Sequence, residues 1–411
     1  MGRSAGCLIV ASLLATAAAA VHAADDIGND SGIDAAFRNG RLVFELRPRY
    51  NHIAEDEKPL TTEGGTIRAL FGWHTAPWNG WRLFLEGIHA DRIGAKRFND
   101  DPAEFAASPY PLLPDPRHTG VNRAFAEGRW SDLQVRLGRQ VLRPDGGRWV
   151  SDNDFRQVPQ LFDGAIATYA GLPEMALAAG HFRRIRTTSG DTQSLRLRLL
   201  HAAWNPRHGH ALAAYGVFHE QAQNGAFTGF ADNSYRVAGA RAEGAFGTAA
   251  GLELPYHLEY AAQRPYARGD VRIEADYWRA GAGIATRDWT LRYDHEVKGS
   301  NAGHYGVQMP LTDFYAFNGW TLHFFNTPRQ GLRDRWLTAR WSIGPVTLYA
   351  EAHRFRSDFG GLDFGREVDV GLTWHVHPDA ALRLQHAHYE PGSGGIGGAV
   401  SKTWLTLGYA Y

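Results

Sequence analysis

The chain ends in KTWLTLGYAY, residues 402–411. A β-strand points successive side chains to opposite faces, so this segment predicts a strand with one apolar face, made by Thr403, Leu405, Leu407, Tyr409 and Tyr411. A soluble protein rarely ends on an exposed apolar strand, because an open edge invites aggregation. A closed outer-membrane β-barrel has reason to do so, since its last strand closes the barrel and faces lipid.

The other end of the chain predicts export. Arg3 supplies a positive charge, residues 8–20 are apolar, and residues 21–23 (VHA) have the small-x-small form of a cleavage site. We therefore expect a secretory signal peptide, residues 1–23, followed by a single barrel domain, residues 24–411. A membrane anchor is the alternative, but the apolar run is shorter than the roughly 20 residues of a spanning helix.

Composition excludes several classes of protein. The 411 residues carry a formal net charge of zero, 12% aromatic residues and 47 glycines, and after the signal no apolar run is long enough for a membrane helix. Helical membrane proteins and basic nucleic-acid binders are therefore excluded. The single cysteine, Cys7, lies in the predicted signal, so the mature chain would carry no thiol. A large soluble β protein remains an alternative. A membrane barrel fits the modest mean hydropathy equally well, because its lipid-facing apolar residues alternate with polar ones.

Alternating segments recur along the chain, with one face apolar and the other charged. Examples are residues 42–47, 67–74, 81–86, 133–137, 195–199, 252–260, 289–294, 346–353 and 367–374. Short connections alternate with longer ones, which we expect at residues 51–65, 90–120, 141–161, 183–193, 220–232, 298–334, 356–366 and 390–401. If residues 317–325 are loop, the pattern predicts an all-β transmembrane barrel of about eighteen antiparallel strands, with about sixteen as the fallback. Short turns would face the periplasm and long loops the outside, and the interior would hold an aqueous channel.

Three stretches carry a family resemblance. They are LGRQVLRPDGGRWVSDNDFRQVPQLFDGAIATY at residues 137–169, then YGVQMPL, FNGW and TPRQGLRD within residues 305–334, and SDFGGLDFGREVDVGLTW at residues 357–374. In this order they resemble the alginate-export porin family of proteobacterial outer membranes. The resemblance implies an 18-stranded barrel. The family's best-known members pass the anionic polysaccharide alginate through an arginine-rich pore. Many relatives are diverse porins, so the resemblance implies a channel more firmly than it implies alginate.

Arginine is the predominant cation, because only four of the 43 basic residues are lysine. Its planar guanidinium stays charged and binds carboxylates through two hydrogen bonds, which suits a carboxylated solute. We predict pore-lining or solute-binding roles for Arg47, Arg49, Arg68, Arg136, Arg148, Arg156, Arg196, Arg198 and Arg292. We predict an acidic lumen or gate from Asp163, Glu351, Glu367 and Asp369. The alternative is that these charges pair with one another across neighbouring strands and serve only the structure.

The loop at residues 141–161 is rich in charge. It is either a solvated outer loop or a constriction folded into the lumen, and the resemblance favours the constriction. Its acids lack the glycine and terminal glutamate of a calcium-binding loop. The chain has neither a G-x-S-x-G nor an H-E-x-x-H motif, and its late histidine pairs lack a third ligand. We therefore predict no catalytic residue, no metal and no cofactor.

Together these patterns predict an outer-membrane channel for anionic solutes, such as a carboxylated polysaccharide or oligosaccharide like alginate. A general or small-organic-acid diffusion porin is the alternative, followed by a barrel enzyme or a surface receptor. The expected partners are outer-membrane lipid, the carboxylated solute and the barrel-assembly machinery, with no nucleic acid. We expect the barrel to be monomeric.

Overall fold

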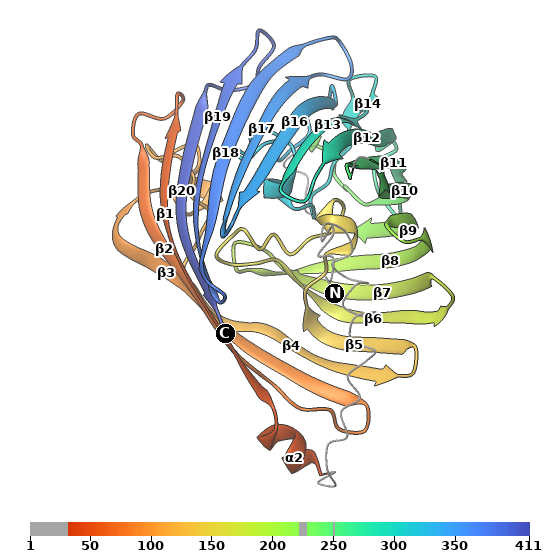
Figure 1. Cartoon of the computed structure of the whole chain (residues 1–411). Coiled ribbons are helices and arrows are strands. Elements are labelled where there is room, and N and C mark those ends of the chain that lie inside the picture. Colours follow the sequence, from red (N-terminus) through yellow and green to blue (C-terminus); the bar gives the residue numbers. More distant parts are fainter. Residues whose placement is uncertain (1–31, 222–227, 250) are drawn as a thin grey trace.

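A closed β-barrel dominates the computed structural model, which describes residues 32–221, 228–249 and 251–411 (Figure 1). Within these residues, 18 antiparallel strands form a single sheet. Each barrel strand pairs with the next one along the chain, and the last strand pairs with the first. The predicted fold class is confirmed, whereas the predicted signal peptide lies outside the described residues.

The barrel strands are β1 (Arg41–Glu55), β2 (Thr62–His74), β3 (Trp81–Arg97), β4 (His118–Trp130), β5 (Leu133–Gln140), β6 (Leu161–Leu172), β7 (Met175–Arg186), β8 (Thr192–Arg207), β9 (His210–Glu220), β10 (Tyr235–Gly247), β11 (Glu253–Pro265), β12 (Ala275–Ala285), β13 (Trp289–Lys298), β16 (Leu332–Ile343), β17 (Val346–Arg356), β18 (Asp363–His377), β19 (Ala380–Pro391) and β20 (Val400–Ala410). The remaining elements are the helix α2 (Ile33–Arg38), the two-residue strands β14 (Ser300–Asn301) and β15 (Tyr305–Gly306), and three 3-10 turns, Pro102–Glu104, Pro144–Gly147 and Phe314–Ala316. Among the described residues, no helix has the length and apolar character that a membrane crossing requires.

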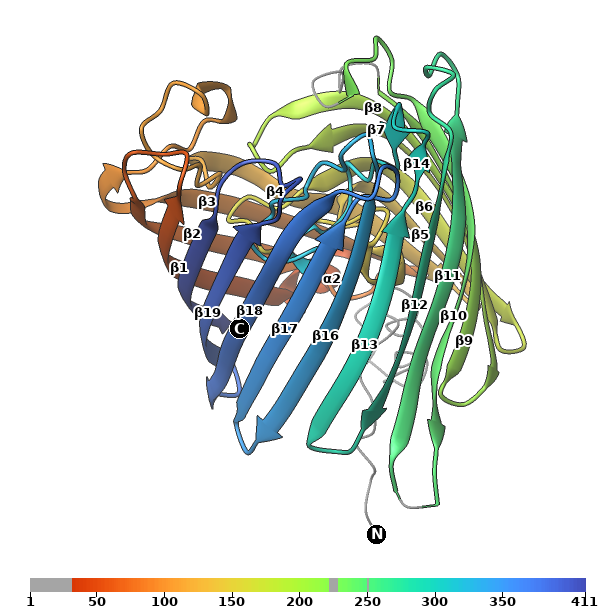
Figure 2. The same ribbon diagram turned by 90° about the horizontal axis from the view of Figure 1, so that it is seen from above.

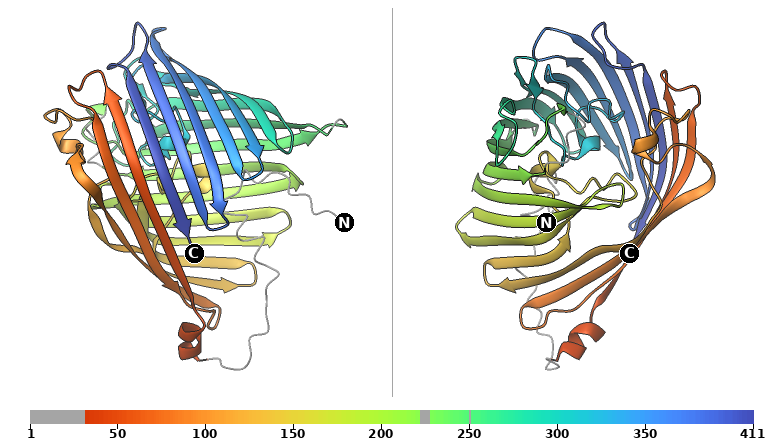
Figure 3. Two further views of the ribbon diagram at one scale, coloured as in Figure 1. Left: turned by 60° about the vertical axis from the view of Figure 1, so that its left-hand side comes forward. Right: turned by 180° about the vertical axis from the view of Figure 1, so that it is seen from behind.

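The two rims of the barrel differ, with tight turns at one end and longer loops at the other (Figure 2). The helix α2 lies at the short-turn rim, where Ala76 N donates to Ala36 O. The C-terminus also lies toward this rim (Figure 3). Residues 317–325 contain no strand, as predicted. Several predicted loops are shorter than expected, because β1 alone has 15 residues and extends past the roughly 9–11 that cross a bilayer.

The last strand alternates as its sequence predicts. Leu405 and Leu407 are 43% and 41% exposed on the outer face, whereas Trp404 and Thr406 are 2% and 3% exposed inside the barrel. Strand β20 pairs with β1 on one side and β19 on the other, so no free edge remains at the end of the chain. The apolar alternation is therefore the lipid-facing surface of a closed barrel.

Strand β8 corrects one prediction. Leu195, Leu197 and Leu199 are buried toward the lumen, and Arg196 and Arg198 point outward. The two arginines contact Glu220 and Tyr266 near the long-loop rim, away from the lumen. The prediction assumed that the lumen beside β8 is filled with water. Loop residues instead form an apolar core there, and the leucines of β8 pack against it.

Two loops supply most of the loop residues in that core, and Phe230 and Ile273 come from two others. The inner loop, residues 141–160, and the long loop, residues 299–331, both contribute buried side chains to one large cluster with strands β6–β12. From the inner loop come Leu142, Trp149 and Val150, and from the long loop Tyr305, Val307, Met309 and Leu311. The β6–β12 side of the lumen is therefore largely filled by side chains. A cavity of about 110 Å³ remains there, between the inner loop and strands β6–β10.

Candidate functional site

The inner loop crosses the lumen and contacts opposite walls of the barrel (Figures 1 and 3). Asp154 reaches Arg68 on β2, while Arg148 reaches Glu296 on β13. The loop therefore forms a constriction rather than a solvated outer loop. Five of the predicted arginines are brought together around it: Arg47, Arg49, Arg68, Arg148 and Arg156.

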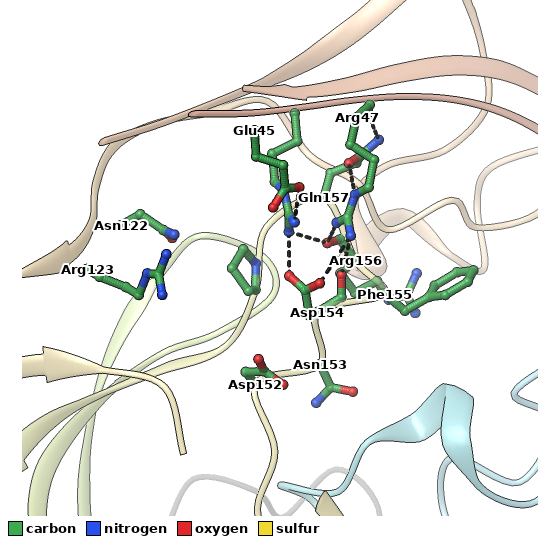
Figure 4. A network of polar contacts seen from close by, with 12 residues as sticks. Glu45, Arg47, Asn122, Arg123, Asp152, Asn153, Asp154, Phe155, Arg156 and Gln157 are labelled. Carbon is green, nitrogen blue, oxygen red and sulfur yellow. Dashed lines mark hydrogen bonds and ion pairs between the residues drawn. The ribbon is translucent and has the colours of Figure 1, made fainter. Parts of the chain in front are cut away.

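Arginines on β1 and β2 anchor one end of the inner loop (Figure 4). Arg47 donates to the Gln157 side chain at 3.2 Å and to the Asp154 carbonyl at 2.7 Å. Arg68 donates to the Asp154 carboxylate at 2.7 Å and also pairs with Glu45. Arg47 and Arg68 are only 7% and 1% exposed, so they bind the loop to the wall rather than face open solution.

Asp154 is the anion at this junction. Its place inside the barrel favours the neutral acid, but Arg68 and Arg47 outweigh that effect and lower the pKa of Asp154 to about 2. The carboxylate therefore stays charged at any physiological pH. Since its side chain remains 51% exposed, it also faces the open part of the lumen.

The far end of the inner loop is anchored by buried polar contacts. Arg148 pairs with Glu296 at 2.6 Å, and both side chains are almost fully buried. Trp149 Nε1 donates to the Tyr215 hydroxyl at 2.8 Å. Asp145 accepts from Arg241 of β10 at 2.6 Å. These contacts hold the loop to strands β9, β10 and β13.

The long loop locks the inner loop in place. Asn153 donates its side-chain amide to Thr312 O at 2.8 Å and accepts from Phe314 N at 3.0 Å. Arg143 joins Asp152 of its own loop to Asp313 of the long loop. The constriction is therefore built from two loops that share hydrogen bonds, not from one loose segment.

An aromatic cavity of about 310 Å³ lies beside the inner loop. It is lined by Phe155, Tyr315, Ala316, Trp320, Tyr349, Glu351, Gln385 and Trp404. The Phe155 and Tyr315 rings stack with their centroids 3.6 Å apart, and Trp320 stacks on Tyr349 at 5.5 Å. The cavity thus offers flat apolar faces on two sides, with a carboxylate and an amide among its lining groups.

Two guanidiniums stand behind these rings. Arg49 lies over Phe155, 4.1 Å from the ring centroid, and donates to Phe155 O and Thr406 Oγ1. Arg156 lies over Tyr315 at 5.0 Å. Within the part of the chain that the structure describes, neither arginine forms an ion pair with a carboxylate. Their charge is therefore not cancelled by direct contact and makes this side of the cavity positive.

The predicted acidic residues are divided. Glu351, Glu367 and Asp369 gather on β17 and β18, and Glu351 reaches the cavity. Asp163 instead pairs with Arg139 of the neighbouring strand at 2.7 Å. Asp163 therefore pairs across neighbouring strands, as expected if these charges serve only the structure.

The remaining predicted arginines lie away from the constriction. Arg136 pairs with Glu127 at 2.7 Å, and Arg292 pairs with Asp294 at 2.7 Å. Both face the lumen, but each is held by a carboxylate. As described above, Arg196 and Arg198 are on the outer side of β8 and line no part of the lumen.

The aromatic lining was not predicted as a site. In the sequence, Phe155 and Tyr315 lie in loops without alternation, and a tryptophan such as Trp404 is equally typical of an interfacial girdle. The only signal in the sequence was the position of Trp404 next to Leu405 in an alternating strand, which places Trp404 on the face opposite the lipid. Nothing in the sequence brings these three rings together, because the contact depends on both lumen loops.

A closed 18-stranded barrel with its lumen narrowed by inserted loops defines an outer-membrane channel of the porin type. The family model for alginate export matches residues 70–298, which is more than half of the chain. The protein therefore belongs to the alginate-export family. Comparison with curated proteins finds no match.

Solved structures from Pseudomonas aeruginosa share the fold. OccK9 (OpdG) has a TM-score of 0.70 at 16% identity, covering 91% of this chain and 99% of that one. OpdL gives 0.68 at 14% identity, covering 91% and 99%. OpdK, solved with vanillate, gives 0.69 at 15% identity, covering 90% and 98%. At these identities the likeness shows the architecture and not the solute.

Proposed function

We propose that this channel passes carboxylated solutes along the wall where Arg49 and Arg156 back the aromatic cavity. The observation that carries the proposal is the pair of guanidiniums without carboxylate partners beside a lumen cavity of about 310 Å³. Uncancelled positive charge at a narrow point raises the local concentration of anions. The stacked rings give a flat solute an apolar surface, while the two guanidiniums behind the rings attract its carboxylate.

The solute is either a carboxylated saccharide chain, such as alginate, or a small organic acid. Family membership supports the first. The small cavity volume supports a small organic acid or a single extended saccharide chain, because the inner loop is bound to both walls and limits the free space. OpdK was solved with vanillate, a small aromatic acid, and has the same fold. In this proposal, residues 1–23 are removed on export, and the assembly machinery inserts the mature chain as a monomeric barrel.

The test is block of single-channel current in planar bilayers. Alginate oligosaccharides, a monomeric aromatic acid and a neutral oligosaccharide of matched length are added in turn. We expect the carboxylated solutes to interrupt the current and the neutral one to pass without effect. Arg156→Gln should weaken the block several-fold, because it removes a cation that lies over the Tyr315 ring and forms no ion pair with a described carboxylate.

Arg196→Gln is the matched control, because it removes an arginine on the outer side of the barrel. Its block should equal that of the wild type. Equal block by neutral and carboxylated solutes, or equal loss in both variants, would contradict the proposal. Block by the aromatic acid alone would assign the channel to small organic acids, and block by the oligosaccharides alone would assign it to the saccharide.

A further inference from the structure

A cluster of acids whose only basic partner among the described residues is a histidine lies in the barrel wall beside the cavity. It contains Asp334 of β16, Glu351 and His353 of β17, and Glu367 and Asp369 of β18. Asp334, Glu367 and Asp369 are at most 1% exposed. Among the residues that the structure describes, no arginine or lysine forms an ion pair with any of these four carboxylates. Burying that much negative charge requires compensation, either by a cation or by protons.

His353 is oriented by one acid and faced by two others. Its Nδ1 lies 3.0 Å from Asp334 Oδ1, and an ionised carboxylate only accepts, so Nδ1 carries the hydrogen. The other nitrogen, Nε2, lies 3.4 Å from Glu351 Oε2 and 3.8 Å from Asp369 Oδ2. A carboxylate that holds one imidazole nitrogen while the other points at a metal is the usual arrangement of a histidine ligand.

The shorter of the two distances around Nε2 fits a pair of metal ligands and is long for a charged hydrogen bond. A charged hydrogen bond from an imidazolium to a carboxylate is about 2.7–2.9 Å long, shorter than either distance observed. Ligands about 2.0–2.2 Å from a tetrahedral ion lie about 3.3–3.6 Å apart. The Glu351 distance of 3.4 Å lies in this range, and the Asp369 distance of 3.8 Å lies slightly above it. The three ligand atoms of Glu351, His353 and Asp369 all lie within 4.8 Å of one another, so one ion could draw them together with small side-chain movements.

Hydrogen bonds from neighbouring groups orient the Glu351 and Asp369 carboxylates. Glu351 Oε1 accepts from Thr338 Oγ1 at 2.9 Å and from the Tyr349 hydroxyl, which leaves Oε2 for the cluster. Asp369 Oδ2 accepts from Trp320 N at 3.3 Å. Asp369 Oδ1 is fully buried and has no hydrogen-bond partner. An unpartnered oxygen on a buried carboxylate calls for a ligand that the described residues do not supply, and a cation meets that need in a group with no arginine or lysine partner.

We propose that Glu351, His353 and Asp369 bind one divalent transition-metal ion, with zinc as the best fit to one imidazole and two carboxylates. Three protein ligands leave a fourth position open, and Glu351 borders the cavity, so the ion is reached from the lumen. The ion compensates the buried acids and joins β17 to β18. This site is separate from the arginines of the proposed solute path.

The test uses the full folded barrel in detergent. After treatment with chelator, zinc is titrated calorimetrically, and cobalt is titrated in parallel while its visible absorption is recorded. We expect one equivalent to bind with a Kd in the micromolar range or below, and cobalt to give the intense bands of a low-coordinate site. Asp369→Asn and His353→Gln should each weaken zinc binding at least tenfold.

His257→Gln is the matched control. His257 also lies between two acids, but Glu243 faces Nδ1 and Glu259 faces Nε2, each at 3.3 Å. Because these acids sit on opposite sides of the ring, one ion cannot join all three, and this variant should bind zinc as the wild type does. Heat-modifiable mobility on gels checks that each variant is folded.

Absence of stoichiometric zinc and cobalt binding to the folded wild-type barrel would overturn the proposal, whatever the variants do. That result would mean that protons shared among the carboxylates compensate the charge. Wild-type binding that survives both Asp369→Asn and His353→Gln would overturn it as well, because the ion would then lie elsewhere. Neither result depends on which solute the channel passes.

Discussion

Asp154→Asn should release the constriction from the β1 and β2 wall. The wild-type carboxylate accepts from Arg68 at 2.7 Å and from Arg47 at 3.3 Å. Hydrogen bonds between charged groups contribute about 1.5–3 kcal/mol. Because the Asp154 side chain is 51% exposed, solvent screens it, and Asn keeps one acceptor, so we take about 1.5–2 kcal/mol for the loss. At about 1.4 kcal/mol per factor of ten, the undocked inner loop becomes about 10- to 30-fold more populated.

The assay is the frequency of larger-conductance excursions in single-channel recordings. Asp154→Asn should raise that frequency by the same factor, while the melting temperature of the barrel changes little, because its strands are held by the sheet. Asp152→Asn is the control: it removes an equal charge from the same loop, but Asp152 pairs with Arg143 and not with the wall. Traces of Asp154→Asn that match the wild type, or an equal increase in Asp152→Asn, would refute the anchoring role of Asp154.

Two further predictions concern the lipid face and pH. Leu405→Arg, on the outer face of β20, should impair assembly in liposome folding assays by about 2–4 kcal/mol, whereas Gln385→Arg, which lines the cavity, should fold almost normally; equal defects would contradict the assigned faces. The pKa of Asp154 is lowered to about 2, so its anchoring is fully present above the ordinary value near 3.8 and is lost only as pH falls through about 2. Recordings at pH 7.5 and pH 5 should therefore show the same frequency of large excursions, and a rise already at pH 5 would exclude Asp154 as the controlling group.

The sequence predicted the barrel well, because the lipid face is set by a simple alternation. Segments such as β20 show it directly, since Leu405 and Leu407 face lipid and Trp404 and Thr406 face inward. The same rule failed at β8. In β8, the alternation predicted that the arginines face the lumen and the leucines face lipid. The structure has the reverse, because Leu197 packs on loop residues inside the barrel. Alternation gives two faces but does not say what fills the lumen.

The site was only partly accessible from sequence. The arginines of β1 and β2 were predicted from their inward parity, and the inner loop from its resemblance to the family. Their pairing with Asp154, and the stacking of Phe155 on Tyr315, depend on contacts between residues 86 or more positions apart. The acidic cluster around His353 likewise comes from three neighbouring strands. No local motif encodes such contacts, because each strand supplies only one or two residues.

The reversal potential of the wild-type channel in a salt gradient tests the central claim most directly. Among the described residues, no carboxylate forms an ion pair with Arg49 or Arg156, and both stand beside the inner loop that narrows the lumen. The account predicts a reversal potential of the sign given by anion preference, and a shift toward cations in Arg156→Glu. A cation-selective wild-type channel, or a reversal potential that Arg156→Glu leaves unmoved, would contradict it.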